Sequence, residues 1–269
     1  MLLYGGPYGN LQATKALLAE ADRLGIGGDD LICTGDAVAY GADPQPVCDL
    51  LRARGVPVVM GNCEESLGLD SGDCGCGFAD GSACDVMAAH WFAYCRKAVN
   101  DETRAWMGTL PRQLRFSMAG RQVAVVHGGA DAINAYVFAS TPAAEKRRQC
   151  GLLGADLVVG GHAGLPFADV DAGWINAGVI GLPANDGTTR GWYALLEPVD
   201  GDIRIELRPL RFDHVAAAAR MRAKGLPEDY ARAMETGLWP NCDILPDAET
   251  AARGSALSPR RLLLDSRTS

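Results

Sequence analysis

The chain has 269 residues, of which 48% are hydrophobic, so it can bury a full core in one large or two small domains. Its formal net charge of −8 excludes the positive surface that a nucleic-acid partner needs. No stretch is long and apolar enough to span a bilayer, and a strand is predicted almost at residue 1. We therefore expect no membrane anchor and no signal peptide, and we place the protein in the cytoplasm.

The first part of the chain alternates between short apolar strands and amphipathic helices. Asn10 is a typical helix cap, and Gly25 would end the helix that it starts. A second helix is predicted with Asp43 as its cap and Pro44 at its first position, and it would end at Gly55. The predicted strands lie at residues 2–4, 31–34 and 57–60.

The later part of the chain is richer in β hairpins. Ala119-Gly120 and Asp200-Gly201 are typical hairpin turns, and Ser82 begins a helix through a capping box. We predict hairpins at 114–118 with 121–126 and at 190–197 with 203–210. We also predict a strand at 157–159, a strand end within 174–178, and helices after Ser82, after Thr141 and within 213–237.

These elements predict one mixed α/β domain over residues 1–212, built as a four-layer αββα sandwich in which two mixed sheets pack face to face. Residues 213–269 would form a C-terminal helical extension and tail, packed on the same domain or trailing from it. We expect no regular structure beyond Pro246, because that segment is polar and carries no periodic pattern.

Four of the predicted strands end in a residue that can bind a metal ion. They are Asp36, Asn62, His127 and His162, and a glycine lies next to each in the sequence. If these strand ends meet along one sheet edge, they form a site with two nitrogen and two oxygen ligands. Such a set suits zinc, iron or manganese, and the sequence does not choose among them.

The order and context of these residues resemble the calcineurin-like metallophosphoesterases, in particular their small bacterial phosphodiesterase branch. Gly35-Asp36, Gly61-Asn62, His127 and Gly161-His162 match the family motifs in order over roughly residues 1–200. The resemblance implies the αββα fold and a two-metal centre. It also implies that Asn62, His127 and His162 hold one metal, with Asp36 as a bridging ligand.

The same resemblance implies that the other metal has lost every ligand of its own. The three family positions are occupied by Gly6, Tyr8 and Gly164. Neither Gly6 nor a neutral Tyr8 is a good ligand, although a tyrosinate can bind ferric iron. The substitutions at these three family ligand positions thus leave one complete metal site beside one without ligands of its own.

The nine cysteines form no regular disulfide framework. Cys63 stands where the resemblance implies a catalytic histidine, so it is either a thiolate ligand or redox group or a small space-filling residue. The Cys74-Gly75-Cys76 turn is typical of a chelating or disulfide-forming loop and could reach the metals. Most other cysteines lie on apolar faces and are expected in the core.

Three functions remain open from the sequence. The first is a metal-dependent phosphoesterase acting on a small phosphoester, with Asn62 and Cys63 at the reacting group. It would work either with one metal ion or with two, the second held by Cys63, Cys74 and Cys76. The second is a non-hydrolytic metal- or redox-responsive binding protein, and the third is a pseudoenzyme on the same fold. The first is preferred because it is the usual chemistry of the fold, which does not by itself establish function.

Overall fold

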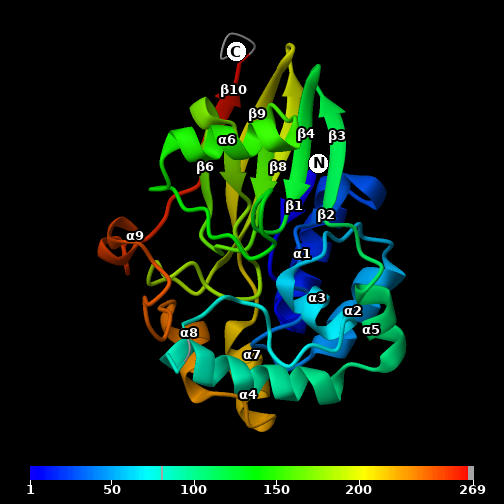
Figure 1. Cartoon of the computed structure of the whole chain (residues 1–269), viewed down its shortest axis with the longest axis vertical. Coiled ribbons are helices and arrows are strands. Elements are labelled where there is room, and N and C mark those ends of the chain that lie inside the picture. The colour runs from blue at the N-terminus through cyan, green and yellow to red at the C-terminus, as the bar shows by residue number, and fades with distance from the viewer. Residues whose placement is uncertain (80, 266–269) are drawn as a thin grey trace.

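The computed structural model describes residues 1–79 and 81–265, and in it two five-stranded mixed sheets stack with helices outside them (Figure 1). The first sheet has the order β10-β9-β8-β1-β2 and the second the order β3-β4-β5-β7-β6. This arrangement confirms the predicted αββα sandwich.

The strands of the first sheet are β1 (Leu2–Tyr4), β2 (Leu31–Cys33), β8 (Gly191–Val199), β9 (Asp202–Leu210) and β10 (Arg260–Leu264). Those of the second sheet are β3 (Gln113–Met118), β4 (Arg121–Val126), β5 (Leu157–Gly160), β6 (Phe167–Asp169) and β7 (Trp174–Asn176). The α-helices are α1 (Leu11–Leu24), α2 (Pro44–Ala53), α3 (Asn62–Gly68), α4 (Ala83–Ala98), α5 (Asp101–Met107), α6 (Ala143–Leu153), α7 (His214–Ala223), α8 (Glu228–Thr236) and α9 (Asp247–Ala251). Two short 3₁₀ turns lie at Gly28–Asp30 and Val170–Ala172.

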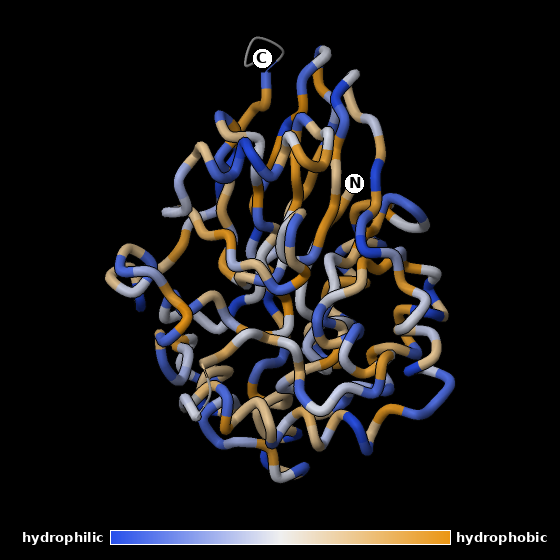
Figure 2. The backbone as a smooth tube through the Cα atoms, in the orientation of Figure 1, coloured by the Kyte–Doolittle hydropathy of each residue, from blue (hydrophilic) through white to orange (hydrophobic). Residues whose placement is uncertain are grey.

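Alternation of side chains along the strands builds the layers. In β4, Val123 and Val125 belong to the core between the sheets, whereas Ala124 and Val126 pack with Cys150 of α6 on the outer face. The first sheet behaves in the same way, since Leu3 faces the other sheet and Leu2 faces the helices. Figure 2 shows these apolar strands inside a largely hydrophilic periphery.

Two expectations about strands were wrong. Residues 57–60 form only an isolated parallel bridge between Val58 and Cys33 at the edge of β2. Pro57 has no N–H for a longer ladder, and the N–H of Met60 donates to Pro111 instead. The tail beyond Pro246 is ordered as far as it is described, because it contains α9 and then β10, which pairs antiparallel with β9 and buries Leu264.

The C-terminal segment returns to the body of the molecule. Helix α7 packs against α1 and α8, and its Arg220 forms an ion pair with Asp43, whose side chain makes no cap hydrogen bond to α2. Among the described residues, we find no helix with both the length and the apolar character needed to cross a membrane.

Candidate metal centre

Asp36 sits in a tight turn directly after β2. Its backbone has φ of +55° and that of Gly35 has φ of +106°, so both lie in the left-handed region that favours glycine. A Cβ atom at Gly35 would lie 2.8 Å from Nδ1 of His127. Glycine is therefore required before Asp36, because only glycine lets the loop after β2 meet the histidine after β4.

His127 follows β4 and is fixed by a hydrogen bond to the neighbouring sheet. Its Nδ1 lies 2.8 Å from the carbonyl oxygen of Thr34, which can only accept, so Nδ1 carries the proton. In the neutral ring, Nε2 then holds a free electron pair. A fixed tautomer of this kind is what a metal-binding histidine needs.

Three further atoms converge on Nε2 of His127. Oδ1 of Asn62 and Nδ1 of His162 are each 3.0 Å away, and Oδ2 of Asp36 is 3.3 Å away. The amide nitrogen of Asn62 donates to the carbonyl oxygen of Cys74 at 2.9 Å, which turns Oδ1 toward the histidines. In the tautomer of His162 that leaves Nδ1 unprotonated, four electron-pair donors face one point, an arrangement that a cation stabilises.

The four side chains come from both sheets rather than from one edge. Asp36 follows β2 of the first sheet, His127 and His162 follow β4 and β5 of the second, and Asn62 begins α3. All four are buried, and ligand atoms of Asp36, His127 and His162 lie within 4.8 Å of one another. The structure therefore brings together the four residues that the sequence singled out.

The electrostatics of the site agree with this geometry. Burial and the nearby His127 lower the pKa of His162 to about 3, so its ring stays neutral and can act as a ligand. Burial works to lower the pKa of His127, but the Asp36 carboxylate outweighs it and the pKa is raised. Burial works to raise the pKa of Asp36, but His127 outweighs it and the pKa is lowered.

Glu64 is a site residue that sequence reasoning did not single out. It is fully buried, and its carboxylate accepts the backbone N–H groups of Asp36 at 2.8 Å, Ala37 at 2.8 Å and Gly61 at 2.9 Å. Burial and the charge of Asp36 raise its pKa to about 7. Glu64 occupies the third position of α3, where it caps the helix, and this capping position is the signal that could have identified it.

Aromatic rings lie against Gly6 and Gly164, two of the positions that the resemblance assigned to a second metal. A Cβ atom at Gly6 would lie 2.5 Å from Cζ of Tyr8, so the Tyr8 ring occupies the place of any side chain at position 6. A Cβ atom at Gly164 would meet Trp239 at 3.5 Å. Burial and Asp36 raise the pKa of Tyr8 well above its usual value, which argues against the tyrosinate that the sequence left open.

The three cysteines of interest gather around Asn62 rather than among the ligand atoms. Nδ2 of Asn62 lies 3.6 Å from Sγ of Cys63 and 3.4 Å from Sγ of Cys76. Cys74 and Cys76 are joined in a disulfide, so neither sulfur is a metal ligand in this state. Burial, Asp36 and Glu64 raise the pKa of Cys63, so a thiolate there would require a cation close by.

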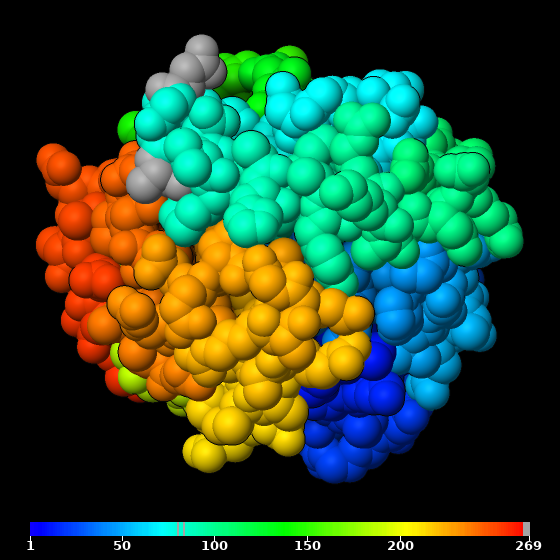
Figure 3. All heavy atoms as spheres, turned by 90° about the horizontal axis from the view of Figure 1, so that it is seen from below, coloured from blue at the N-terminus to red at the C-terminus, as the bar shows by residue number. Residues whose placement is uncertain are grey.

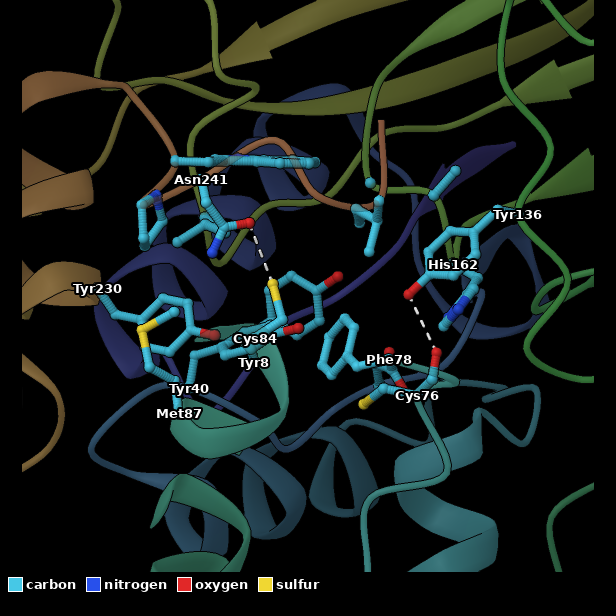
Figure 4. A pocket seen from close by; sticks show the side chains of 17 residues that line it. Tyr8, Tyr40, Cys76, Phe78, Cys84, Met87, Tyr136, His162, Tyr230 and Asn241 are labelled. Carbon is cyan, nitrogen blue, oxygen red and sulfur yellow. Dashed lines mark hydrogen bonds between the residues drawn. The ribbon is translucent and has the colours of Figure 1, made fainter. Parts of the chain in front are cut away.

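A small pocket opens beside the metal centre. It has a volume of about 60 Å³, and both Asp36 and His162 line it. Tyr136 and His162 lie on one side of it, and Tyr230 and Met87 on the other (Figure 4). Cys84 at the start of α4 and Asn241 of the C-terminal segment both line the pocket. Sγ of Cys84 lies 3.2 Å from Oδ1 of Asn241. These two parts of the chain meet at the surface in Figure 3.

A buried site with two histidines, one carboxylate and one amide, held at the strand ends of an αββα sandwich, defines a metal-binding α/β protein. Residues 9–201 match the model of the calcineurin-like phosphoesterase superfamily domain. Because this match covers well over half of the chain, the protein belongs to that superfamily.

Individual relatives match most of the chain, and the solved structures among them share its fold. An uncharacterized protein, MJ0912, from Methanocaldococcus jannaschii is 24% identical over 239 residues, which cover 82% of this chain and 91% of the relative. A crystal structure of a metallophosphoesterase from Sphaerobacter thermophilus matches with a TM-score of 0.68 and 23% identity, covering 88% of this chain and 98% of its own. The crystal structure of the hypothetical protein PH1004 from Pyrococcus horikoshii matches with a TM-score of 0.75 and 16% identity. The match covers 89% of this chain and 98% of PH1004.

Proposed function

We propose that this protein is a metal-dependent phosphoesterase that hydrolyses a small phosphodiester or phosphomonoester at a single complete metal site. The observation that carries the proposal is the convergence of Asn62 Oδ1, His162 Nδ1 and Asp36 Oδ2 on Nε2 of His127. Membership of a phosphoesterase superfamily supports the reaction type. The net charge of −8 argues against nucleic acid as the substrate.

The chain's own residues have distinct tasks in this reaction. A metal held by these four side chains would polarise a phosphoryl oxygen and lower the pKa of a bound water. Thr34 holds the His127 tautomer, and the carbonyl oxygen of Cys74 orients the amide of Asn62. Burial of the site excludes bulk water and strengthens these interactions. Cys63, next to Asn62, lies beside the reacting group in this proposal.

The test is hydrolysis of bis(p-nitrophenyl) phosphate by protein that has been stripped with a chelator and reloaded with manganese, zinc or iron. We expect activity only in the loaded protein. His127→Ala should lower kcat/KM by more than about a hundredfold, because the loss of a ligand should exceed the roughly 10–100-fold effect of losing an outer partner. His90→Ala is the matched control, since His90 is exposed on α4. Equal activity of the stripped protein or of His127→Ala would contradict the proposal.

A second candidate is a binding protein that responds to thiol oxidation. It is favoured by the Cys74–Cys76 disulfide, because the carbonyl oxygen of Cys74 and the sulfur of Cys76 both contact the amide of Asn62. If this candidate is right, reduction by a dithiol releases two thiols per chain and changes metal affinity about tenfold or more without any hydrolysis. Thiol counting and metal titration of oxidised, reduced and Cys76→Ser protein separate it from the first.

A further inference from the structure

The pocket beside the metal centre is built mainly from aromatic rings. Its polar lining is confined to Asp36, His162, Asn241 and tyrosine hydroxyls, and of the described residues that line it none is lysine or arginine. The rings are Tyr8, Tyr40, Phe78, Tyr136, Tyr230 and Trp239.

These rings line the pocket in two groups, one around Tyr40 and one beside the metal ligand His162. The Tyr40 ring lies 4.8 Å from Tyr8 and 4.6 Å from Tyr230, measured between centroids, and the Tyr136 ring lies 4.4 Å from His162. Centroid separations of this size are typical of favourable aromatic contacts. Figure 4 shows the labelled rings surrounding the pocket. A ligand bound to the metal centre therefore extends directly into an aromatic environment.

Two of these rings lie where the second metal would have its own ligands. Tyr8 covers Gly6, and Trp239 packs against Gly164, so aromatic surface has replaced a cation-binding half-site. This change removes a place for additional negative charge. With no lysine or arginine in the lining, a second phosphate or a carboxylate on the ligand would be buried without a partner, which is costly.

The charge of the lining sets a further limit. Asp36 lines the pocket, and of the described lining residues none is lysine or arginine, so each negative charge on the ligand would lie near a carboxylate without a cationic side chain. A monoanion therefore fits better than a dianion. The space of about 60 Å³ is smaller than a whole ester, so the part of the ligand beyond the aromatic group would lie outside it, where the pocket opens to solvent.

We propose that this pocket binds the uncharged, planar aromatic group of a monoanionic phosphodiester whose phosphoryl group lies at the metal centre. The inference rests on the proposed function for the position of the phosphoryl group. It adds the substrate class, which is an aryl or heteroaryl phosphodiester rather than an alkyl ester or a polyphosphate.

The experiment compares diphenyl phosphate with diethyl phosphate, two monoanions that differ in their ester groups, by calorimetric titration of the metal-loaded protein. We expect diphenyl phosphate to bind about tenfold tighter or more. Tyr230→Ala and the milder Met87→Ala should each reduce the ratio of the two affinities. If Tyr230→Ala fails to fold, the result with Met87→Ala is the test. Leu152→Ala, an exposed position on α6, is the control and should keep the ratio.

The outcomes separate this inference from the proposed function. Equal affinity for the two diesters, or a ratio unchanged in a folded pocket variant, overturns the aromatic pocket even when hydrolysis is observed. Selective binding of diphenyl phosphate that the pocket variants reduce, without hydrolysis of any phosphodiester, supports the pocket and overturns the phosphoesterase. Binding of neither diester overturns the pocket assignment as well.

Discussion

The substitution Glu64→Gln tests whether a buried carboxylate holds the metal loop in place. Glu64 accepts three backbone N–H groups, two of them at Oε2 from Asp36 and Gly61, and one at Oε1 from Ala37. Glutamine has one acceptor oxygen, which can keep the two hydrogen bonds from the N–H groups of Asp36 and Gly61. Its NH₂ group then faces the N–H of Ala37, so one buried donor loses its partner.

The magnitude follows from that lost partner. A buried donor left unsatisfied costs about 1–3 kcal/mol, so we expect the free energy of unfolding to fall by about 2 kcal/mol. The loop that carries Asp36 also loses one of the hydrogen bonds that hold it, the one at Ala37. Loss of an outer-shell partner lowers metal affinity by about 10–100-fold, and we expect a loss in that range.

Urea unfolding of the metal-free protein measures the first effect, and competition with a chelator of known affinity measures the second. Glu65→Gln is the matched control, because Glu65 is the next residue of α3 and pairs with Arg112 at the surface. It should change stability by no more than about 1 kcal/mol and should leave metal affinity unchanged. If Glu64→Gln matches the wild type in both assays, the carboxylate does not organise this loop.

Three further predictions concern neighbouring positions. Gly6→Asp should lower the free energy of unfolding by about 2 kcal/mol, because φ at Gly6 is +41° and the Tyr8 ring blocks the side chain. In urea unfolding, adding Tyr8→Ala should recover part of this loss. If the two substitutions change the free energy of unfolding independently, the contact between the two positions is contradicted. Cys63→Ala should retain the metal, since Sγ of Cys63 is not among the clustered ligand atoms; loss of metal in elemental analysis would show that the sulfur is a ligand. The pKa of His127 is raised, so metal binding must displace a proton from it. The association constant for the metal should therefore rise about tenfold per pH unit below that pKa and level off above it. Metal titrations that give the same association constant from about pH 5.5 to about pH 8 would refute this.

Local patterns predicted much of the fold because they act over a few residues. Asn10 accepts a hydrogen bond from the N–H of Ala13 as a helix cap, and Gly25 ends α1 with φ of +69°. The hairpin of β3 and β4 turns at Ala119-Gly120 as expected. Burial of Cys33 and Cys48 also follows the apolar pattern around them.

The features that were missed depend on contacts between distant parts of the chain. The strand β10 forms because β9 offers it an edge, and the short run around Leu262 does not reveal that partner. The packing of Trp239 against Gly164 joins residues 75 positions apart, and the carboxylate of Glu64 reaches the loop after β2 only once α3 has docked. Motif spacing pointed to Asp36, Asn62, His127 and His162, but it could not show that aromatic rings pack beside this site.

The most direct test of the single complete metal site is elemental analysis of the purified protein after extensive dialysis, repeated with His162→Ala. One tightly held transition-metal ion per chain is expected in the wild type and none in the variant, because His162 would supply one of four ligands in the proposed site. His214→Ala, on α7 away from the site, should retain the ion. Two tightly held ions per chain, or a metal content that His162→Ala leaves unchanged, would contradict the account.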